Sequence, residues 1–370
     1  MSQSIYWLEE NYISLDKYFE DNQISRFLLV CDQSFDFLKV KKYFDSLEER
    51  KSGSFAVFSD FHSNPSYDSV VRGVRTYHDE RCEAIVAVGG GSAMDVAKCI
   101  KLYCYSDPDE ASIPQDVKIN DIKLMVMPTT AGTGSEATRY AVIYHNGVKQ
   151  SITDESIIPS TVMYDTSVLK TLPVYHRNSS MMDALCHAIE SFWSINSTEE
   201  SRGYSDEAIR MILKNMNELD SPDDELYKRM FHAAYIAGKA INITQTTAGH
   251  AMSYKLTSMY GISHGHAAAI CDMSLFPWMI CNTDKCIDAR GKEYLESTFD
   301  KIADAMGCST PKEAADRFGE IVRFMELKAP TPKPEDYAVL KTSVNPTRLK
   351  NHPIKLDEDS IDALYHEILK

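Results

Sequence analysis

The stretch AIVAVGGGSAMDVAK, residues 84–98, places an apolar run, three consecutive glycines and the start of a helix one after another. Glycines at such a turn leave backbone N–H groups uncovered at a helix N-terminus, which favours a bound phosphate or pyrophosphate. The loop is neither a G-x-G-x-x-G fingerprint nor a Walker A motif. A tight strand-to-helix turn without a ligand also explains a glycine triplet, so this stretch alone leaves the ligand open.

Further apolar runs predict the sheet to which this strand belongs. They lie at residues 26–31, 55–58 and 124–127, and an amphipathic stretch at 68–79 separates two of them. Continuous apolar strands that alternate with helices are typical of a parallel sheet covered on both faces. We therefore predict an α/β domain with a parallel sheet over residues 1–165.

The remainder of the chain has a different pattern. Helical periodicity dominates, strand-like runs are scarce, and the predicted helices cover residues 180–193, 205–216, 227–241, 294–306 and 359–369. We predict an all-α domain over residues 166–370.

Composition limits the classes of protein and partner. The 370 residues are 44% hydrophobic and 25% charged, which suits about two globular domains, and the net charge of −15 argues against nucleic acid and anionic membranes as partners. No apolar run approaches the roughly 20 residues of a membrane span, and the N-terminus lacks the pattern of a signal peptide. Nine cysteines without a C-x-x-C pair indicate reduced thiols. We expect a cytoplasmic protein with a small-molecule substrate.

A second polar loop strengthens the case for a nucleotide. The stretch PTTAGTGSE, residues 128–136, also follows a predicted strand and offers hydroxyl and N–H groups. Two such loops at the carboxyl ends of parallel strands form the ligand crevice of an open α/β sheet. Asp32 ends a third strand, where its carboxylate can bind ribose hydroxyls or simply cap a turn.

Asp183 and His187 form the nucleus of a candidate metal site. They are four residues apart in the helical stretch DALCHAIE, residues 183–190, so they share one helix face. His250 and His264 follow, each next to a glycine. One carboxylate and three imidazoles suit Fe²⁺ or Zn²⁺ and leave coordination open for a substrate oxygen. Taken singly, each histidine is as well explained as a capped or core residue.

These motifs, in this order and spacing, resemble the iron-dependent (group III) alcohol dehydrogenases over nearly the whole chain. The resemblance implies a dehydroquinate synthase-like fold. Its Rossmann-like domain, residues 1–165, would bind NAD(P), and its helical domain, residues 166–370, would carry the metal and substrate sites. It implies four metal ligands, namely Asp183, His187, His250 and His264. It also implies dinucleotide contacts from Asp32, Gly90, Gly91, Ser92, Asp95, Thr129, Thr130, Thr133 and Lys149.

The resemblance further implies metal-dependent reduction of a small aldehyde to its alcohol. The metal would polarise the carbonyl and the nicotinamide would carry the hydride. Asp32 stands at the acidic position that favours NAD(H) over NADP(H), and Fe²⁺ is the expected metal with Zn²⁺ as the alternative. We expect a homodimer or a larger homo-oligomer.

The chain departs from the family at the position of a frequent proton-relay histidine, where it has Tyr254. We therefore take Tyr254 and His266 as the candidates for the catalytic proton relay, with a structural role as the alternative for His266. Arg139, Lys239 and Lys255 add positive charge near the motifs and would suit a phosphonate or phosphate tail. Solvated helix lysines are the simpler explanation of Lys239 and Lys255.

The runs QTTAGHAMSYK, residues 245–255, and YGISHGH, residues 260–266, resemble the branch of this family that reduces phosphonoacetaldehyde to 2-hydroxyethylphosphonate. Three alternatives remain. A general alcohol, aldehyde or diol dehydrogenase would reduce charged and uncharged aldehydes alike. A dehydroquinate synthase-like lyase would consume no net NADH, and a non-catalytic assembly protein would bind no stoichiometric metal.

Overall fold

The computed structural model describes residues 3–47, 49–50, 53–219 and 223–370. Its backbone divides into two compact units, the first made of residues 1–130 and 135–172 and the second of 131–134 and 173–370. The first unit is α/β and the second is helical, which confirms the predicted fold class. The boundary between the two units falls after Leu172, whereas the sequence patterns predicted a domain boundary between residues 165 and 166. In addition, residues 131–134 of the second polar loop group with the helical unit.

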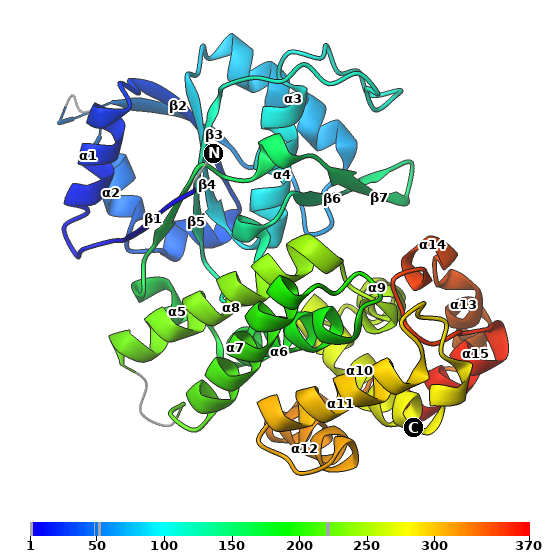
Figure 1. The fold of residues 1–370 in the computed structure, drawn as a ribbon. Helices are drawn as coiled ribbons and strands as arrows, with labels where there is room; N and C mark the ends of the chain where they lie inside the picture. The colour runs from blue at the N-terminus through cyan, green and yellow to red at the C-terminus, as the bar shows by residue number, and fades with distance from the viewer. Residues whose placement is uncertain (1–2, 48, 51–52, 220–222) are drawn as a thin grey trace. The chain divides into compact units, whose positions relative to one another are not determined.

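A six-stranded parallel sheet forms the centre of the first unit (Figure 1). Its strand order is β1-β8-β5-β4-β2-β3, and every neighbouring pair runs parallel. The strands are β1 (Ser4–Trp7), β2 (Arg26–Cys31), β3 (Ser54–Phe58), β4 (Ala84–Gly89), β5 (Lys123–Pro128) and β8 (Thr161–Tyr164).

Helices cover the two faces of this sheet because the apolar residues of its inner strands point alternately to both. On one face, Phe27 packs between Phe19 and Phe44, and this core extends along β4 and β5. The short helices and turns of the unit are α1 (Ile13–Asp21), η1 (Gln33–Phe37), α2 (Lys41–Asp45), α3 (Tyr67–Asp79), α4 (Gly91–Tyr103), η2 (Ser135–Ala137), η3 (Glu155–Ile157) and α5 (Ser167–Thr171).

The strand register brings three loops to one edge of the sheet. Cys31 is opposite Val88 and Gly89 is opposite Pro128, so β2, β4 and β5 end side by side. Asp32 and the loops after β4 and β5 therefore lie along a single edge, as expected for the carboxyl ends of parallel strands.

Three features of the α/β unit did not follow from the sequence pattern. The inner strand β8 is buried, but its four residues were not among the predicted apolar runs. The edge strand β1 is exposed along its length, so it lacks the buried apolar run that reveals an inner strand. A two-stranded hairpin, β6 (Tyr140–His145) and β7 (Val148–Thr153), turns through Asn146 and Gly147 with φ values of 51° and 74°. Positive φ at both positions is the signature of a type I′ turn.

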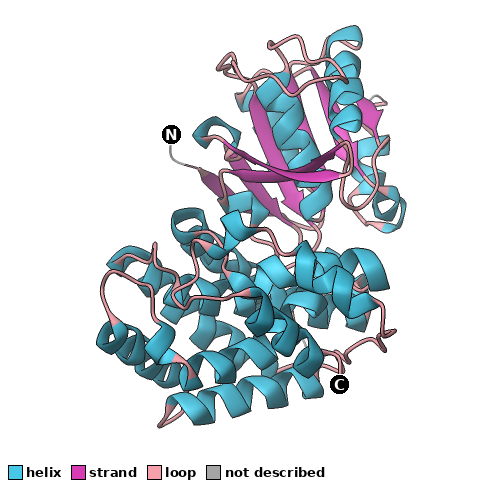
Figure 2. Ribbon diagram, turned by 90° about the vertical axis from the view of Figure 1, so that its right-hand side faces the viewer, coloured by secondary structure: helices cyan, strands magenta, loops and turns pink. Residues whose placement is uncertain are grey.

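The second unit consists of helices and short turns in the part of the chain that is described (Figure 2). The long helices start earlier than predicted, because Thr198 and Asp223 cap α7 and α8 and extend them at their N-termini. The elements are α6 (Val174–Trp193), α7 (Glu199–Met216), α8 (Asp224–Thr244), α9 (Ala248–Tyr260), α10 (His264–Cys281), η4 (Thr283–Lys285), α11 (Lys292–Ala305), α12 (Pro311–Phe324), α13 (Asp336–Ser343), α14 (Pro346–Leu349) and α15 (Glu358–Ile368). Among the described residues, no helix is both long and apolar enough to cross a membrane.

Candidate metal centre and nucleotide-binding loops

The glycine loop after β4 leaves the N-terminus of α4 uncovered. Gly90 is the N-cap residue, and no side chain caps this helix end. A methyl group added to Gly90 would have the Thr130 side chain as its nearest neighbour, 3.7 Å away. The helix end therefore offers backbone N–H groups and open space, the two requirements of a bound phosphate.

The other predicted dinucleotide residues of this edge gather around the same loop. The Thr129 amide donates to the Gly89 carbonyl oxygen at 3.1 Å, which joins the two loops. Asp32 Oδ1 accepts from the Ser34 amide at 2.8 Å, and its Oδ2 lies 3.6 Å from where a Gly89 Cβ would stand. Asp32 thus caps a turn with one oxygen and presents the other beside the glycine loop.

Buried Lys98 holds the chain that follows the second loop. Its ammonium donates to the carbonyl oxygens of Ser135, Thr138 and Tyr140 at 2.5, 2.9 and 2.8 Å. Burial lowers the pKa of Lys98 to about 8, against the opposing effect of Asp95. Asp95 accepts from Ser135 Oγ and from the Val142 amide, each at 2.9 Å, so both of its oxygens anchor protein groups.

The remaining predicted cofactor residues lie along these same elements. Gly91 and Ser92 form the first turn of α4, and Lys149 lies on β7 opposite Tyr144. Thr133 is placed within the four residues that group with the helical unit.

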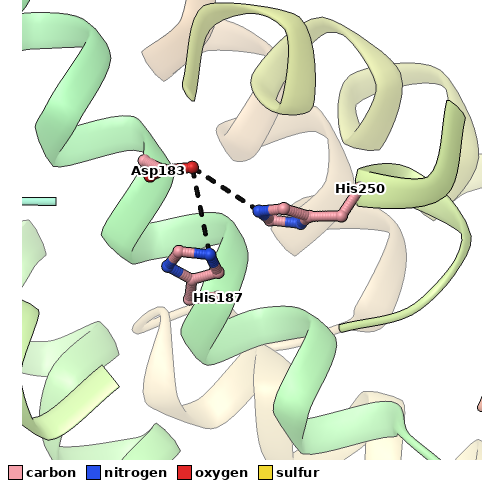
Figure 3. Close-up of side chains that lie close together, drawn as sticks. All are labelled: Asp183, His187 and His250. Atoms are coloured by element: carbon pink, nitrogen blue, oxygen red, sulfur yellow. Dashed lines mark ion pairs between the residues drawn. The ribbon is translucent and has the colours of Figure 1, made fainter. Parts of the chain in front are cut away.

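Three side chains of the helical unit converge on one point (Figure 3). Asp183 and His187 project from the same face of α6, and His250 reaches them from α9. Asp183 Oδ1 lies 3.5 Å from His250 Nε2 and 4.0 Å from His187 Nε2. His264 Nε2, at the start of α10, is also 4.0 Å from this oxygen. The three histidines predicted as metal ligands therefore all lie within 4.0 Å of the fourth predicted ligand, Asp183.

This cluster has the spacing and the unmet bonding capacity of a cation site. Metal–ligand bonds of roughly 2.1 Å put tetrahedral ligand atoms about 3.4 Å apart. Among the described residues, neither Asp183 Oδ1 nor His250 Nε2 has a hydrogen-bond partner, although both are buried. Buried polar atoms without partners are costly unless a further group satisfies them. An Asp-His₃ donor set of this kind fits Fe²⁺ or Zn²⁺.

The charges of the cluster also favour a cation. Burial raises the pKa of Asp183, but the imidazoles of His187 and His264 outweigh it and hold the pKa below its ordinary range. Burial lowers the pKa of His187 to about 4, so this imidazole is neutral at pH 7 with a lone pair for a metal.

Glu190 was not predicted as a functional residue and is the main support of His250. Its Oε1 accepts from His250 Nδ1 and, at 3.0 Å, from the His250 amide. Its Oε2 accepts from the amide and the hydroxyl of Thr247 at 2.5 and 2.6 Å. A proton held on Nδ1 leaves the Nε2 lone pair directed at Asp183, which is how carboxylates orient metal-binding histidines. Glu190 follows Asp183 by seven residues on the same helix face, a spacing that could have revealed it.

Glycines let the three ligand-bearing helices approach closely. A Cβ on Gly265 would lie 2.2 Å from the Ser179 carbonyl oxygen and 2.6 Å from Asp183 Cβ. A Cβ on Gly249 would lie 1.9 Å from Asp272 Oδ1. In the second polar loop, Gly132 and Gly134 pack in the same way against the backbones of Ser180 and Gly238.

The two relay candidates lie in different surroundings. The Tyr254 ring stacks on His264, with ring centroids 5.5 Å apart and an interplanar angle of 6°. His266 is buried, its Nδ1 is 3.0 Å from the Tyr175 hydroxyl and its Nε2 is 2.9 Å from the Lys328 carbonyl oxygen. Since a carbonyl only accepts, Nε2 carries the proton and Nδ1 accepts from Tyr175.

The three predicted substrate cations also differ. Arg139 pairs with Glu155 at 2.5 Å, and the Lys239 ammonium lies 4.1 Å from the centre of the Tyr204 ring. Lys255 is half-buried on α9, next to Tyr254, and its ammonium makes no hydrogen bond or ion pair within the described chain.

An α/β unit with a parallel sheet, followed by a helical unit, is the architecture of the group III alcohol dehydrogenases. Residues 3–166 match the family described as iron-containing alcohol dehydrogenase. Residues 178–369 match the C-terminal part of the Fe-containing alcohol dehydrogenase family. The chain belongs to the iron-containing alcohol dehydrogenase family and is an oxidoreductase.

Individual relatives agree with this assignment. The chain is 30% identical over 333 residues to a phosphonoacetaldehyde reductase of Streptomyces viridochromogenes, covering 83% of this chain and 81% of the relative. It is 25% identical over 361 residues to alcohol dehydrogenase 4 of Saccharomyces cerevisiae, covering 94% and 92% of the two chains. The crystal structure of a sulfoacetaldehyde reductase from Bifidobacterium kashiwanohense in complex with NAD⁺ superposes with a TM-score of 0.85 at 25% identity, covering 100% of this chain and 97% of the other.

Proposed function

We propose that this protein reduces phosphonoacetaldehyde to 2-hydroxyethylphosphonate, with NAD(H) in preference to NADP(H) and with Fe²⁺ at the Asp183 cluster. The observation that carries the reaction type is the convergence of Asp183, His187 and His250 on one point, with His264 beside them. Two relatives named for aldehydes with an anionic tail, a phosphonate and a sulfonate, support the substrate class.

Each group has a defined task in this proposal. The metal supplies Lewis-acid polarisation of a carbonyl and the dinucleotide supplies the hydride. Asp183 and the three histidines hold the cation, while Glu190 keeps His250 in the required tautomer. The uncapped end of α4 binds the pyrophosphate, and Asp32 accepts from the ribose.

We assign the proton relay to Tyr254 in preference to His266. Tyr254 stacks on a proposed ligand, whereas both ring nitrogens of His266 are engaged with Tyr175 and Lys328. Tyr254→Phe should lower kcat about a hundredfold while leaving metal content unchanged, a usual range for a lost general acid. A larger loss of kcat in His266→Asn, with metal content intact, would reverse this assignment.

Lys255 is our choice for the group that binds the phosphonate. Arg139 pairs with Glu155 and the Lys239 ammonium lies against the Tyr204 ring, whereas the Lys255 ammonium has no ion pair, hydrogen bond or ring contact within the described residues. Lys255 also follows Tyr254 in the sequence. Lys255→Met should raise KM for phosphonoacetaldehyde at least tenfold and leave propionaldehyde unaffected. Lys239→Met is the matched control, because the Lys239 ammonium lies against the Tyr204 ring.

The deciding measurement is oxidation of NADH at 340 nm by Fe²⁺-reconstituted protein, with chelated protein as the blank. A preference of a hundredfold or more for phosphonoacetaldehyde over propionaldehyde, about 3 kcal/mol of transition-state discrimination, would support the proposed substrate. Similar rates would indicate a general alcohol, aldehyde or diol dehydrogenase. A higher rate with sulfoacetaldehyde would move the substrate to a sulfonate, and no NADH oxidation with any aldehyde would favour the lyase.

The proposal includes a cytoplasmic homodimer. All nine cysteines are free thiols, as a reducing compartment would keep them. Size-exclusion chromatography with light scattering tests the dimer.

A further inference from the structure

Close to Glu190 lies a further buried carboxyl group that the proposed reaction does not use. Asp272 projects from α10 and is 1% exposed. Neither of its oxygens has a hydrogen-bond partner of ordinary geometry in the described part of the chain, and the weak donor nearby is the Cys186 thiol. Burial makes the ionised form of such a carboxyl group costly, and a thiol offsets little of that cost.

Another carboxylate, that of Glu190, lies close to Asp272. A single point, the place where a Gly249 Cβ would stand, is 1.9 Å from Asp272 Oδ1 and 2.8 Å from Glu190 Oε1. The two carboxyl groups therefore share the space that Gly249 leaves empty. Two ionised carboxylates so close and so buried would repel one another, which disfavours the charged form of one of them.

Asp272 is the member of the pair that holds the proton. Glu190 accepts hydrogen bonds from His250 and from Thr247, and these bonds stabilise its ionised form. Burial and the charge of Glu190 together raise the pKa of Asp272 far above its ordinary range. A neutral carboxyl group has one O–H to donate, and Glu190 is the acceptor that faces it.

We propose that Asp272 is a positioning residue for the metal centre, which donates a hydrogen bond to Glu190 and so fixes the carboxylate that orients His250. The chain of contacts runs from Asp272 through Glu190 and His250 Nδ1 to the Nε2 atom that faces Asp183. This inference rests on the proposed metal site, and it assigns the role to a residue that touches neither metal nor substrate.

The test measures metal binding by the metal-free protein, with no turnover involved. Titration with Co²⁺, followed by its visible d–d absorption, gives the affinity and the geometry of the site. Asp272→Leu replaces the carboxyl group by an apolar side chain and removes the donor, so its affinity for Co²⁺ should fall tenfold or more and its spectrum should change, as for other lost supports of a metal-binding histidine. Asp272→Asn keeps a donor, so its affinity should stay within about threefold of the parent protein.

Ser274→Ala provides the matched control, because Ser274 is a buried polar residue on the same helix. Circular dichroism and thermal unfolding of the metal-free variants show whether each is folded, and Asp272→Ala replaces Asp272→Leu if the latter is not. Parent affinity in Asp272→Leu would overturn the proposal, as would equal losses in the Asn and Leu variants. Failure of the parent protein to bind one Co²⁺ per chain would instead contradict the proposed metal site.

Discussion

Gly90 in the α/β unit is the N-cap of α4, and Gly265 in the helical unit is the second residue of α10, so each stands at the start of a helix beside residues of a proposed site. A methyl group on Gly90 would meet the Thr130 side chain at 3.7 Å, an ordinary contact distance. A methyl group on Gly265 would meet the backbone of Ser179 at 2.2 Å. The first glycine keeps space open for a ligand, and the second lets α10 approach α6 so that His264 reaches Asp183.

The interiors of the two units differ in a related way. Within the described chain, buried polar atoms without hydrogen-bond partners are concentrated in the helical unit, where they include atoms of Asp183, His250, Asp272 and His352. The corresponding buried polar groups of the α/β unit are largely paired, as Lys98 illustrates with its three carbonyl partners. Unpaired groups of this kind mark places where a bound ion or a proton completes the structure.

The largest effect should come from Gly265→Ala. The added Cβ overlaps backbone atoms of α6 that cannot rotate away, so we expect a loss of about 3 kcal/mol or more of unfolding free energy. Metal affinity should fall with it, because α10 carries His264. Thermal unfolding and Co²⁺ titration measure the two effects.

Gly203→Ala is the control, because Gly203 lies within α7 and nothing stands within 4 Å of its added Cβ. This variant should gain roughly 0.5–1 kcal/mol from the better helix propensity of alanine. Comparable losses in both variants would show that close approach of helices is not what Gly265 provides.

His352 should make the stability of the metal-free protein depend on pH. It is fully buried, neither ring nitrogen has a partner among the described residues, and burial lowers its pKa to about 4. The unfolded chain, with a histidine pKa near 6.5, therefore binds the proton more readily than the folded chain between pH 6.5 and pH 4. Stability from this group is complete above pH 6.5 and falls as the pH decreases, by about 2 kcal/mol at pH 5.

His352→Leu removes this dependence. Its unfolding midpoint in urea should change less between pH 8 and pH 5 than that of the parent protein, by the equivalent of those 2 kcal/mol. A variant with the same pH profile as the parent protein would mean that His352 is not held neutral in the fold.

Gly90→Ala tests whether Gly90, in contrast to Gly265, keeps space open for a ligand. The φ value of Gly90 is −78°, which alanine adopts without strain, and the added methyl group has room. Stability should change by less than about 0.5 kcal/mol, while the methyl group obstructs a phosphate at the end of α4 and weakens NADH binding about tenfold, or 1.4 kcal/mol. Fluorescence titration with NADH measures this, and unchanged affinity would move the pyrophosphate away from this loop.

Sequence patterns predicted β2, β3, β4 and β5 and the positions of the two loops, because these strands contain apolar runs that end where polar residues begin. The helical spacing of Asp183 and His187 likewise predicted their shared face on α6, which the structure shows. Patterns did not reveal β1, β8 or the hairpin β6–β7. β1 and β8 have four residues each, and the apolar run of β6 pairs with the largely polar β7 outside the main sheet.

The supports of the site were harder to predict than the residues that face it. Glu190 lies seven residues after Asp183, a spacing that puts both on one helix face, so the sequence contained a signal for it. Asp272 also left a trace, because it is the one charged residue in the run AAAICDMSLFPWMI, residues 267–280, and a helix that is apolar on all sides is ordinarily buried. The pattern does not show that Glu190 is the group beside it, which only the packing of α10 against Gly249 reveals. Which carboxyl groups meet across helices depends on tertiary contacts that a local pattern does not contain.

The smallest effect concerns Asp32 and separates its two roles. Asp32→Ser keeps an oxygen that accepts from the Ser34 amide, so the turn remains capped and stability should change by less than about 0.5 kcal/mol. It removes the negative charge beside Gly89, which in our proposal disfavours the 2′-phosphate of NADPH. The ratio of kcat/KM for NADPH to that for NADH should rise about fivefold to tenfold, and Ser34→Ala, which leaves the carboxylate in place, is the control. If the ratio is the same in Asp32→Ser and the parent protein, then Asp32 serves the turn alone and the preference for NAD(H) must come from another part of the glycine-loop edge.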